Sequence, residues 1–198
     1  MIATVFDFGA GNLHSLAKAL AAAGVEVHVE TDPVRAAAGE LLVLPGVGAF
    51  AAAAARMAPG REALRAALAA GRPCIGICLG MQLLFETSEE GPGEGLGWFR
   101  GRVTRLAARR VPQIGWNTLE DTRDPAFVRA PLATAYYAHS YACRAADPAD
   151  VIAWSRHETD CFPAAVRRGR VIGVQFHPEK SSRDGLRCLA ECVREVTA

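Results

Sequence analysis

The sequence predicts an α/β protein with a single domain, residues 1–198, in which helices flank a central sheet that is mixed but mostly parallel. Strand and helix signals alternate through the first half of the chain, and repeated β-α units of this kind form parallel sheets covered by helices. In the second half, short strand-like pieces separated by turns predict antiparallel pairs. An amphipathic helix is expected from about Ser182, because apolar residues recur there at three- and four-residue spacing: Leu186, Leu189, Val193 and Val196.

Four strands, each followed by a helix, are expected in the first half. The strands are apolar runs or alternating stretches bounded by glycine or proline: residues 2–8, 25–30, 41–46 and 73–78. The helical stretches that follow them are residues 13–24, with Asn12 as N-cap and Gly24 as stop, a short helix opened by Asp32 and Pro33, a long alanine-rich stretch that runs to Ala70, and residues 79–87. Proline suits the first helical position and glycine commonly ends a helix, so local chemistry sets these boundaries.

The pattern changes after residues 88–97, which are polar and rich in turn residues. Short strand-like pieces follow, with turns between them: residues 98–106, 111–119, 134–143, 151–157, 161–170 and 171–176. Short turns join antiparallel neighbours, whereas parallel strands need long crossovers. Several of these strand pairs are therefore expected to be antiparallel.

Composition argues against several classes of function. The chain is 51% hydrophobic and 22% charged, which is enough for a sizeable core. A net charge of +1 does not favour nucleic acid or an anionic membrane as partner, and no apolar run approaches the roughly 20 residues of a membrane-spanning helix. The N-terminus has the pattern of a first strand and not of a signal peptide, so we expect a cytoplasmic protein with reduced cysteines. Its cysteine and histidine spacings are not those of a zinc site, and no metal is expected.

One cysteine stands in a frame of glycines, in "GICLGMQ" from Gly76 to Gln82. A strand, the pattern Gly-x-Cys-x-Gly and a helix make up a nucleophile elbow, whose glycines avoid collisions with neighbouring backbone. Cys78 would then lie at a helix N-terminus, which favours a thiolate, and the amide of Leu79 would face a developing oxyanion. The alternative is a small core residue, which is the interpretation we favour for Cys74, Cys188 and Cys192.

A thiol nucleophile needs a general base, and "VIGVQFHPEKS" (171–181) supplies one. An apolar strand leads into His177, and Pro178 favours extended backbone at the residue before it. In extended backbone, residues i and i+2 point to the same side, so Glu179 would lie beside His177 and orient its imidazole. The other histidines are expected on the surface or in ordinary core contacts, except that His139 would line the site through its backbone.

A glycine-rich turn, "LPGVGAF" (44–50), follows the third strand. Gly46 and Gly48 permit a ligand to approach the backbone closely, and amides of this turn would form the second half of an oxyanion hole. An ordinary tight connection is the alternative.

A dinucleotide site is a rival interpretation of the N-terminal region. "GAGNLH" (9–14) follows the first strand and opens a helix, and Glu30 lies 21 residues after Gly9. The third position of the fingerprint is His14, however, whose side chain would hinder close packing of helix and strand. NAD binding is therefore disfavoured, and no cofactor is expected.

Together these motifs resemble class I glutamine amidotransferases, whose fold is flavodoxin-like. The stretches stand in the family's order along the whole chain: "FDFGAGN", "LPGVGAF", "GICLGMQLLFE", "PQIGWN", "AHSY" and "GVQFHPEKS". "PGVGAF", "IGWN" and the lysine after "HPE" are most similar to the glutaminase subunits of imidazole glycerol phosphate synthases, a family of histidine biosynthesis. Two departures are visible, Phe8 where an aromatic hydroxyl is common and Gln113 where histidine is frequent.

The resemblance assigns a role to each matching position. It implies that Cys78 is the nucleophile, with His177 and Glu179 completing a triad. The oxyanion loop corresponds to Gly46 and Val47, and the glutamine-binding positions are Gln82, His139, Ser140 and Tyr141. Positions that would face a (β/α)₈-barrel cyclase subunit are Asn12, Trp116, Asn117, Tyr136 and Lys180.

The expected reaction is hydrolysis of glutamine to glutamate and ammonia, without cofactor or metal. The resemblance implies that the ammonia passes to the cyclase, which makes imidazole glycerol phosphate and aminoimidazole carboxamide ribotide. Two alternatives are an amidotransferase subunit of another pathway, of the anthranilate or aminodeoxychorismate type, and a non-catalytic scaffold. The peptide between Gly46 and Val47 is further expected to rest turned away from the oxyanion until the partner binds.

Overall fold

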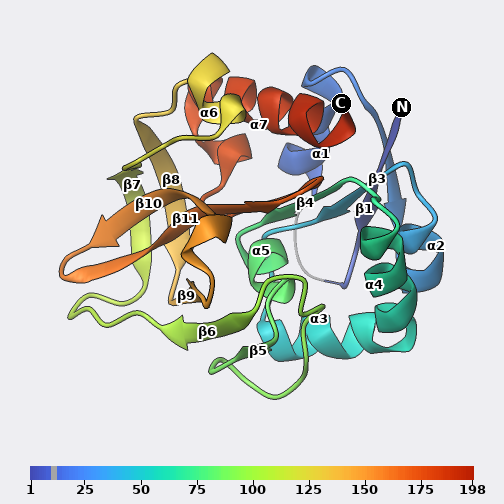
Figure 1. Ribbon diagram of the computed structural model, residues 1–198, viewed down its shortest axis with the longest axis horizontal. Coiled ribbons are helices and arrows are strands. Elements are labelled where there is room, and N and C mark those ends of the chain that lie inside the picture. Colours follow the sequence, from blue (N-terminus) through green and yellow to red (C-terminus); the bar gives the residue numbers. More distant parts are fainter. Residues whose placement is uncertain (10–12) are drawn as a thin grey trace.

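The computed structural model describes residues 1–9 and 13–198, and its centre is a seven-stranded sheet in the order β10-β11-β12-β4-β3-β1-β2 (Figure 1). Five neighbouring strands run parallel: β12 (Val171–Val174), β4 (Cys74–Ile77), β3 (Leu41–Leu44), β1 (Ile2–Phe6) and β2 (Glu26–Glu30). The hairpin of β10 (Val151–His157) and β11 (Asp160–Arg168) adds two antiparallel strands at one edge. The predicted sheet, mixed but mostly parallel, is confirmed.

Helices cover both faces of this sheet and form two cores (Figure 1). One face carries α1 (His14–Ala22), α6 (Pro125–Arg129) and α7 (Ser182–Thr197). The other carries α2 (Pro33–Ala37), α3 (Phe50–Met57), α4 (Arg61–Ala69) and α5 (Leu79–Leu83). Because neighbouring strand residues point to opposite faces, Val43 belongs to the first core and Leu42 and Leu44 belong to the second.

Two small sheets lie beside the central one. The first contains β5 (Thr87–Ser88), β6 (Gly101–Arg105) and β9 (Tyr141–Ala145), and the second pairs β7 (Gln113–Thr118) with β8 (Thr134–His139) in antiparallel fashion. The piece expected at residues 134–143 is thus two strands of different sheets, which part at Ser140. This change of sheet brings residues 138–141 to the end of β4.

The alanine-rich stretch that was expected to run to Ala70 is helical but is not one helix. A 3₁₀ turn, η1 (Ala58–Gly60), separates α3 from α4. Pro59 lacks the N–H that a continuous helix needs. A Cβ on Gly60 would come within 2.7 Å of Pro33, so the glycine also permits α2 to pack closely against this turn.

The helix expected over residues 79–87 ends at Leu83. A loop from farther along the chain takes the carbonyl groups that a longer helix would use, since Leu96 and Gly95 donate their amides to Leu83 and Glu86. Asn12, expected to cap the first helix, lies outside the described residues.

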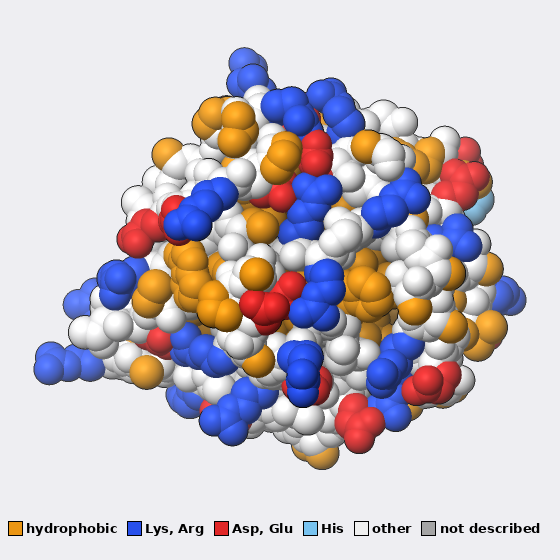
Figure 2. Space-filling model, viewed as in Figure 1, with side chains coloured by type: hydrophobic (Ala, Val, Ile, Leu, Met, Phe, Trp, Pro, Cys, Tyr) orange, Lys and Arg blue, Asp and Glu red, His pale blue; other side chains and the backbone are white. Residues whose placement is uncertain are grey.

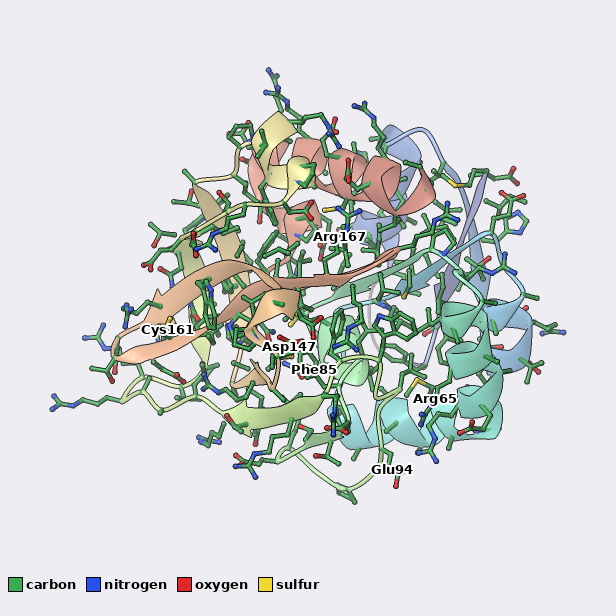
Figure 3. All side chains as sticks on the ribbon, in the orientation of Figure 1. Arg65, Phe85, Glu94, Asp147, Cys161 and Arg167 are labelled. Carbon is green, nitrogen blue, oxygen red and sulfur yellow. The ribbon has the colours of Figure 1, made fainter. Side chains whose placement is uncertain are left out.

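Ion pairs built on arginine fasten the second half of the chain. Arg167, on β11, lies between that strand and α7 (Figure 3), and its guanidinium is 2.9 Å from both Asp124 and Glu195.

On the face shown in Figure 2, basic and acidic side chains are intermingled, in accord with the net charge of +1. None of the helices in the described part of the chain is both long and apolar enough to span a bilayer.

Candidate active site

Cys78 occupies a strained turn between β4 and α5. Its φ of 47° and ψ of −103° are unusual for any residue other than glycine. A Cβ on Gly76 would come within 2.7 Å of the Gly80 backbone, and one on Gly80 would overlap the carbonyl oxygen of Leu44. Both glycines of the motif are therefore sterically required, and the turn has the geometry predicted for a nucleophile elbow.

The thiol of Cys78 is enclosed, and the residue is 5% exposed. Its backbone amide donates to the carbonyl of Val174 at 2.7 Å, which ties the turn to β12. The sulfur lies 4.0 Å from the carbonyl oxygen of Ala138 and 3.5 Å from Nε2 of Gln175. The side chain thus faces the ends of β8 and β12, where His139 and His177 lie.

His177 and Glu179 lie side by side as their spacing predicts. His177 has extended backbone, with φ −103° and ψ 94°, and its Nδ1 is 2.8 Å from Oε1 of Glu179. Their side chains are only 3% and 7% exposed. Burial lowers the pKa of His177, but its hydrogen bonds to Cys78 and Glu179 outweigh burial and raise that pKa to about 10. The structure therefore brings the three residues together as Cys78–His177–Glu179.

The backbone around His177 is fastened by a buried hydroxyl that sequence reasoning missed. Ser181 donates to the carbonyl of His177 at 2.6 Å and accepts from the amide of Tyr136 at 2.9 Å. The carbonyl of Tyr136 in turn accepts from the amide of His177 at 2.8 Å. The backbone of His177 is thus held to β8 by a closed set of hydrogen bonds.

The glycine-rich turn after β3 lies against this cysteine and histidine. A Cβ on Gly46 would come within 2.9 Å of the His177 ring and 3.1 Å of Cys78 Cβ, so only glycine fits there without a shift. Gly48 has φ of 109°, in the region that favours glycine. Gly46 and Leu79 line the pocket described next, whereas Val47 is half-buried beside it.

A pocket of about 310 Å³ opens beside Cys78, within the range of small-molecule sites. Its lining includes the four residues predicted to bind glutamine: Gln82, His139, Ser140 and Tyr141. Sequence reasoning missed Glu90, Pro112, Ile114 and Ala138, which also line it. Glu90 is the acidic residue of this lining, and its carboxylate is held by the amide of Phe50, which donates to its Oε2 at 2.7 Å.

Buried hydrogen bonds shape the inner wall of the pocket. Nδ1 and Nε2 of His139 lie 2.9 Å from the carbonyl of Tyr141 and 3.0 Å from Oε1 of Gln113. Burial lowers the pKa of His139 to about 4, so this ring is neutral at pH 7. Gln82 donates to the same carbonyl of Tyr141 at 2.9 Å. His139 therefore supports the wall with its side chain.

Three of the predicted interface residues form one cluster. The rings of Trp116 and Tyr136 meet edge to face with centroids 6.4 Å apart, and Nζ of Lys180 is 6.0 Å from the Tyr136 centroid. Trp116 is 55% exposed. Asn117 does not join the cluster, because its side chain donates to the carbonyl of Arg156. Asn12 lies outside the described residues.

Comparison with known proteins gives the class of protein first. The family model described as "Glutamine amidotransferase class-I" matches residues 4–196. A solved structure described as "Crystal structure of glutamine amidotransferase" superposes with a TM-score of 0.77 at 20% identity, covering 100% of both chains. That likeness shows the fold, and the family match agrees with the elbow, the histidine and the glutamate.

The relatives narrow the class. The chain is 48% identical to "Imidazole glycerol phosphate synthase subunit HisH" of Symbiobacterium thermophilum, covering 97% of this chain and 93% of that protein. It is 44% identical to the subunit of the same name from Synechococcus sp. (strain JA-2-3B'a(2-13)), covering 97% and 92%. The chain therefore belongs to the HisH family of class I glutamine amidotransferases.

Proposed function

We propose that this chain hydrolyses glutamine through Cys78, His177 and Glu179, as the glutaminase subunit of an imidazole glycerol phosphate synthase. The observation that carries the proposal is the strained Cys78 turn, whose sulfur faces a buried His177–Glu179 pair beside a pocket. A scaffold without catalytic function would have no need of this strain or of a buried charged pair. Membership in the HisH family is the second support.

The reaction begins when the Cys78 thiolate attacks the side-chain carbonyl carbon of glutamine. The tetrahedral oxyanion forms beside the amides of Leu79 and Val47, which would stabilise its charge. Because the pKa of His177 is raised to about 10, its imidazolium holds a proton at neutral pH and gives it to the departing ammonia. Neutral His177 then takes a proton from water, which attacks the thioester, releases glutamate and frees Cys78.

Two side chains of the pocket suit the polar ends of the substrate. Both N–H groups of the Gln82 amide are engaged, by Tyr141 and by Gln175, so a ligand that reaches Gln82 meets its Oε1. The carboxylate of Glu90 would pair with the α-ammonium group of glutamine, since opposite charges attract strongly in a partly enclosed site. Neither contact involves the reacting bond, and both would fix the amide over Cys78.

The proposed partner is a (β/α)₈-barrel cyclase subunit that consumes the ammonia. The exposed cluster of Trp116, Tyr136 and Lys180 would face it, because tryptophan and tyrosine are enriched at binding surfaces and Lys180 would add a charge beside their rings. Tyr136 is also bonded to the backbone of His177, so the cluster lies one hydrogen bond from the triad. We place the reaction in the cytoplasm, where the six cysteines, which are unpaired, would stay reduced.

The test is glutamine hydrolysis by the complex of this chain with the barrel subunit. Cys78→Ala should lower it by on the order of 10⁴-fold or more, because the nucleophile is lost. The fold should remain, and the cyclase should still work with added ammonium salts. A glutamine-mimicking electrophile should label Cys78 and leave the five other cysteines unlabelled. Near wild-type hydrolysis by Cys78→Ala would show that the mechanism is wrong.

A further inference from the structure

Gln175 is a fully buried amide beside the proposed nucleophile. It follows β12 directly and is 0% exposed. Its Nε2 donates to the sulfur of Cys78 at 3.5 Å, and its Oε1 accepts from Nε2 of Gln82 at 3.5 Å. One side chain therefore touches both the residue proposed to attack glutamine and a residue proposed to bind it.

Burying this polar amide lowers the stability of the fold unless its hydrogen bonds compensate, which suggests that the amide has a function. The residues around it, from Val171 to Phe176, are otherwise an apolar run, and a buried amide is destabilising unless it is hydrogen-bonded. An apolar side chain of similar size would fill the same space without that cost. Both ends of the Gln175 amide reach site residues, so the interactions that stabilise it are those of the active site.

We propose that Gln175 is a positioning residue that aims the Cys78 sulfur and favours its thiolate; the inference rests on the function proposed above. A thiol sulfur is a weak acceptor, and an ionised acceptor forms the stronger hydrogen bond, so the N–H of Gln175 stabilises the charged form more than the neutral one. Its Oε1 occupies one N–H of Gln82, while Tyr141 occupies the other. The Oε1 of Gln82 is thereby left to accept a hydrogen bond from a ligand in the pocket.

Other groups that influence Cys78 come from several elements and are untouched by a change at Gln175. His177, with Glu179 behind it, approaches from the end of β12, and Cys143 interacts with Cys78 from β9. Glu90 and His139 share the pocket with the thiol. If replacing Gln175 alone changes the pH dependence of Cys78 reactivity, that change therefore reports the hydrogen bond from the Gln175 amide.

The experiment measures alkylation of Cys78 by iodoacetamide between pH 5 and 10, read by mass spectrometry of the peptide that contains it. Gln175→Met keeps an unbranched side chain of similar length but removes the N–H. It should slow alkylation at pH 7 by about tenfold or more, the loss expected for one hydrogen bond to a charged group, and move the midpoint to higher pH. In the complex with the barrel subunit, kcat should fall in parallel.

Gln82→Met is the matched control, because it makes the same change at the other buried amide of this network and spares the bond to sulfur. Its alkylation rate and midpoint should stay close to wild type, while its KM for glutamine rises. A wild-type alkylation profile in Gln175→Met would overturn the inference. So would an equal shift in Gln82→Met, which would show a general loosening of the site.

Two further measurements test the role of Gln175: NMR of its side-chain amide and glutamine hydrolysis by the complex. If Gln175→Met does not fold, the side-chain NH₂ resonance of Gln175 in the ¹⁵N-labelled wild-type protein should titrate with the alkylation midpoint, and an invariant resonance would refute the contact. Failure of the proposed function is distinguishable, because it would appear as glutamine hydrolysis that is absent from the wild-type complex or persists in Cys78→Ala. Normal hydrolysis with unaltered alkylation in Gln175→Met refutes only the role of Gln175.

Discussion

At the scale of single residues, the site depends on positions where only one residue type fits, and three of these are glycines. Gly76 and Gly80 let the chain turn at Cys78, and Gly46 lets the loop after β3 touch His177. These residues are visible in the sequence because glycine frames and the spacing of histidine and glutamate leave a local pattern. Glu90 left none: it stands in a polar turn beside Glu89, and only the fold of that loop decides which of the two glutamates lines the pocket.

Glu90 gives the first prediction. Glu90→Gln keeps an oxygen acceptor for the amide of Phe50 but removes the charge that would pair with the α-ammonium group of glutamine. KM should rise by about 10- to 100-fold, the equivalent of one charged hydrogen bond, with a smaller effect on kcat. Glu89→Gln is the control, since Glu89 accepts from Arg105 outside the pocket. Equal KM values for the two variants would contradict the role of Glu90.

His139 gives a prediction about pH. Burial lowers its pKa to about 4 in the folded protein, whereas the usual value is 6.5, so between these values the unfolded chain binds more protons. The free energy of unfolding should therefore fall as pH falls from about 6.5 to about 4, by about 3 kcal/mol from this group. Measured by urea unfolding, the free energy of unfolding should depend less steeply on pH in His139→Asn than in wild type. If the two plots of free energy against pH are parallel, His139 does not have a lowered pKa.

At the scale of elements, local chemistry predicted where helices begin better than where they end. Asp32 and Pro33 open α2 as predicted, with the Asp32 carboxylate accepting from two amides. The same dipeptide opens α6 at Asp124 and a 3₁₀ turn at Asp147, and this signal could have revealed both. The early end of α5 could not be predicted, because residues 95–97 decide it through contacts distant in sequence.

Ser181 joins the turn after β12 to Tyr136 of β8, and its loss should disturb His177 in that turn. Ser181→Ala should lower stability by about 1–3 kcal/mol, because buried partners on His177 and Tyr136 lose their hydrogen bond. The kcat for glutamine should fall as well, since His177 loses its anchor. Ser182→Ala, which changes the exposed neighbouring serine, is the control, and both variants are compared by urea unfolding and by glutamine turnover. Unchanged kcat in Ser181→Ala would mean that the imidazole needs no such support.

At the scale of the whole molecule, the topology places the site where the chain changes from parallel to antiparallel neighbours. β4 and β12 are adjacent and parallel, so the segments after their carboxyl ends, which carry Cys78 and His177, meet although they are 99 residues apart (177 − 78). The class of fold could be predicted from alternating strands and helices. The two small sheets could not, because nothing local says which sheet β8 and β9 will join.

Lys180 tests whether the exposed cluster serves a partner. Only Lys18 and Lys180 are lysines in a chain with 22 basic residues. Lys180→Ala should weaken binding of the barrel subunit by about tenfold, a change of about 1.4 kcal/mol, while the fold remains. Lys18→Ala, on the exposed side of α1, is the matched control in the same titration. Equal affinities for the two variants would remove Lys180 from the interface.

The central claim is that this chain is a glutaminase whose site its partner completes, and glutamine turnover tests it most directly. Turnover is measured for the chain alone, with the barrel subunit, and with the barrel plus its nucleotide ligand, using Cys78→Ala as the blank. We predict slow turnover by the chain alone and a rise at each step, of about 10²–10³-fold in all if the partner turns one oxyanion donor into place. Equal turnover in all three mixtures, or none above the blank, would contradict the account.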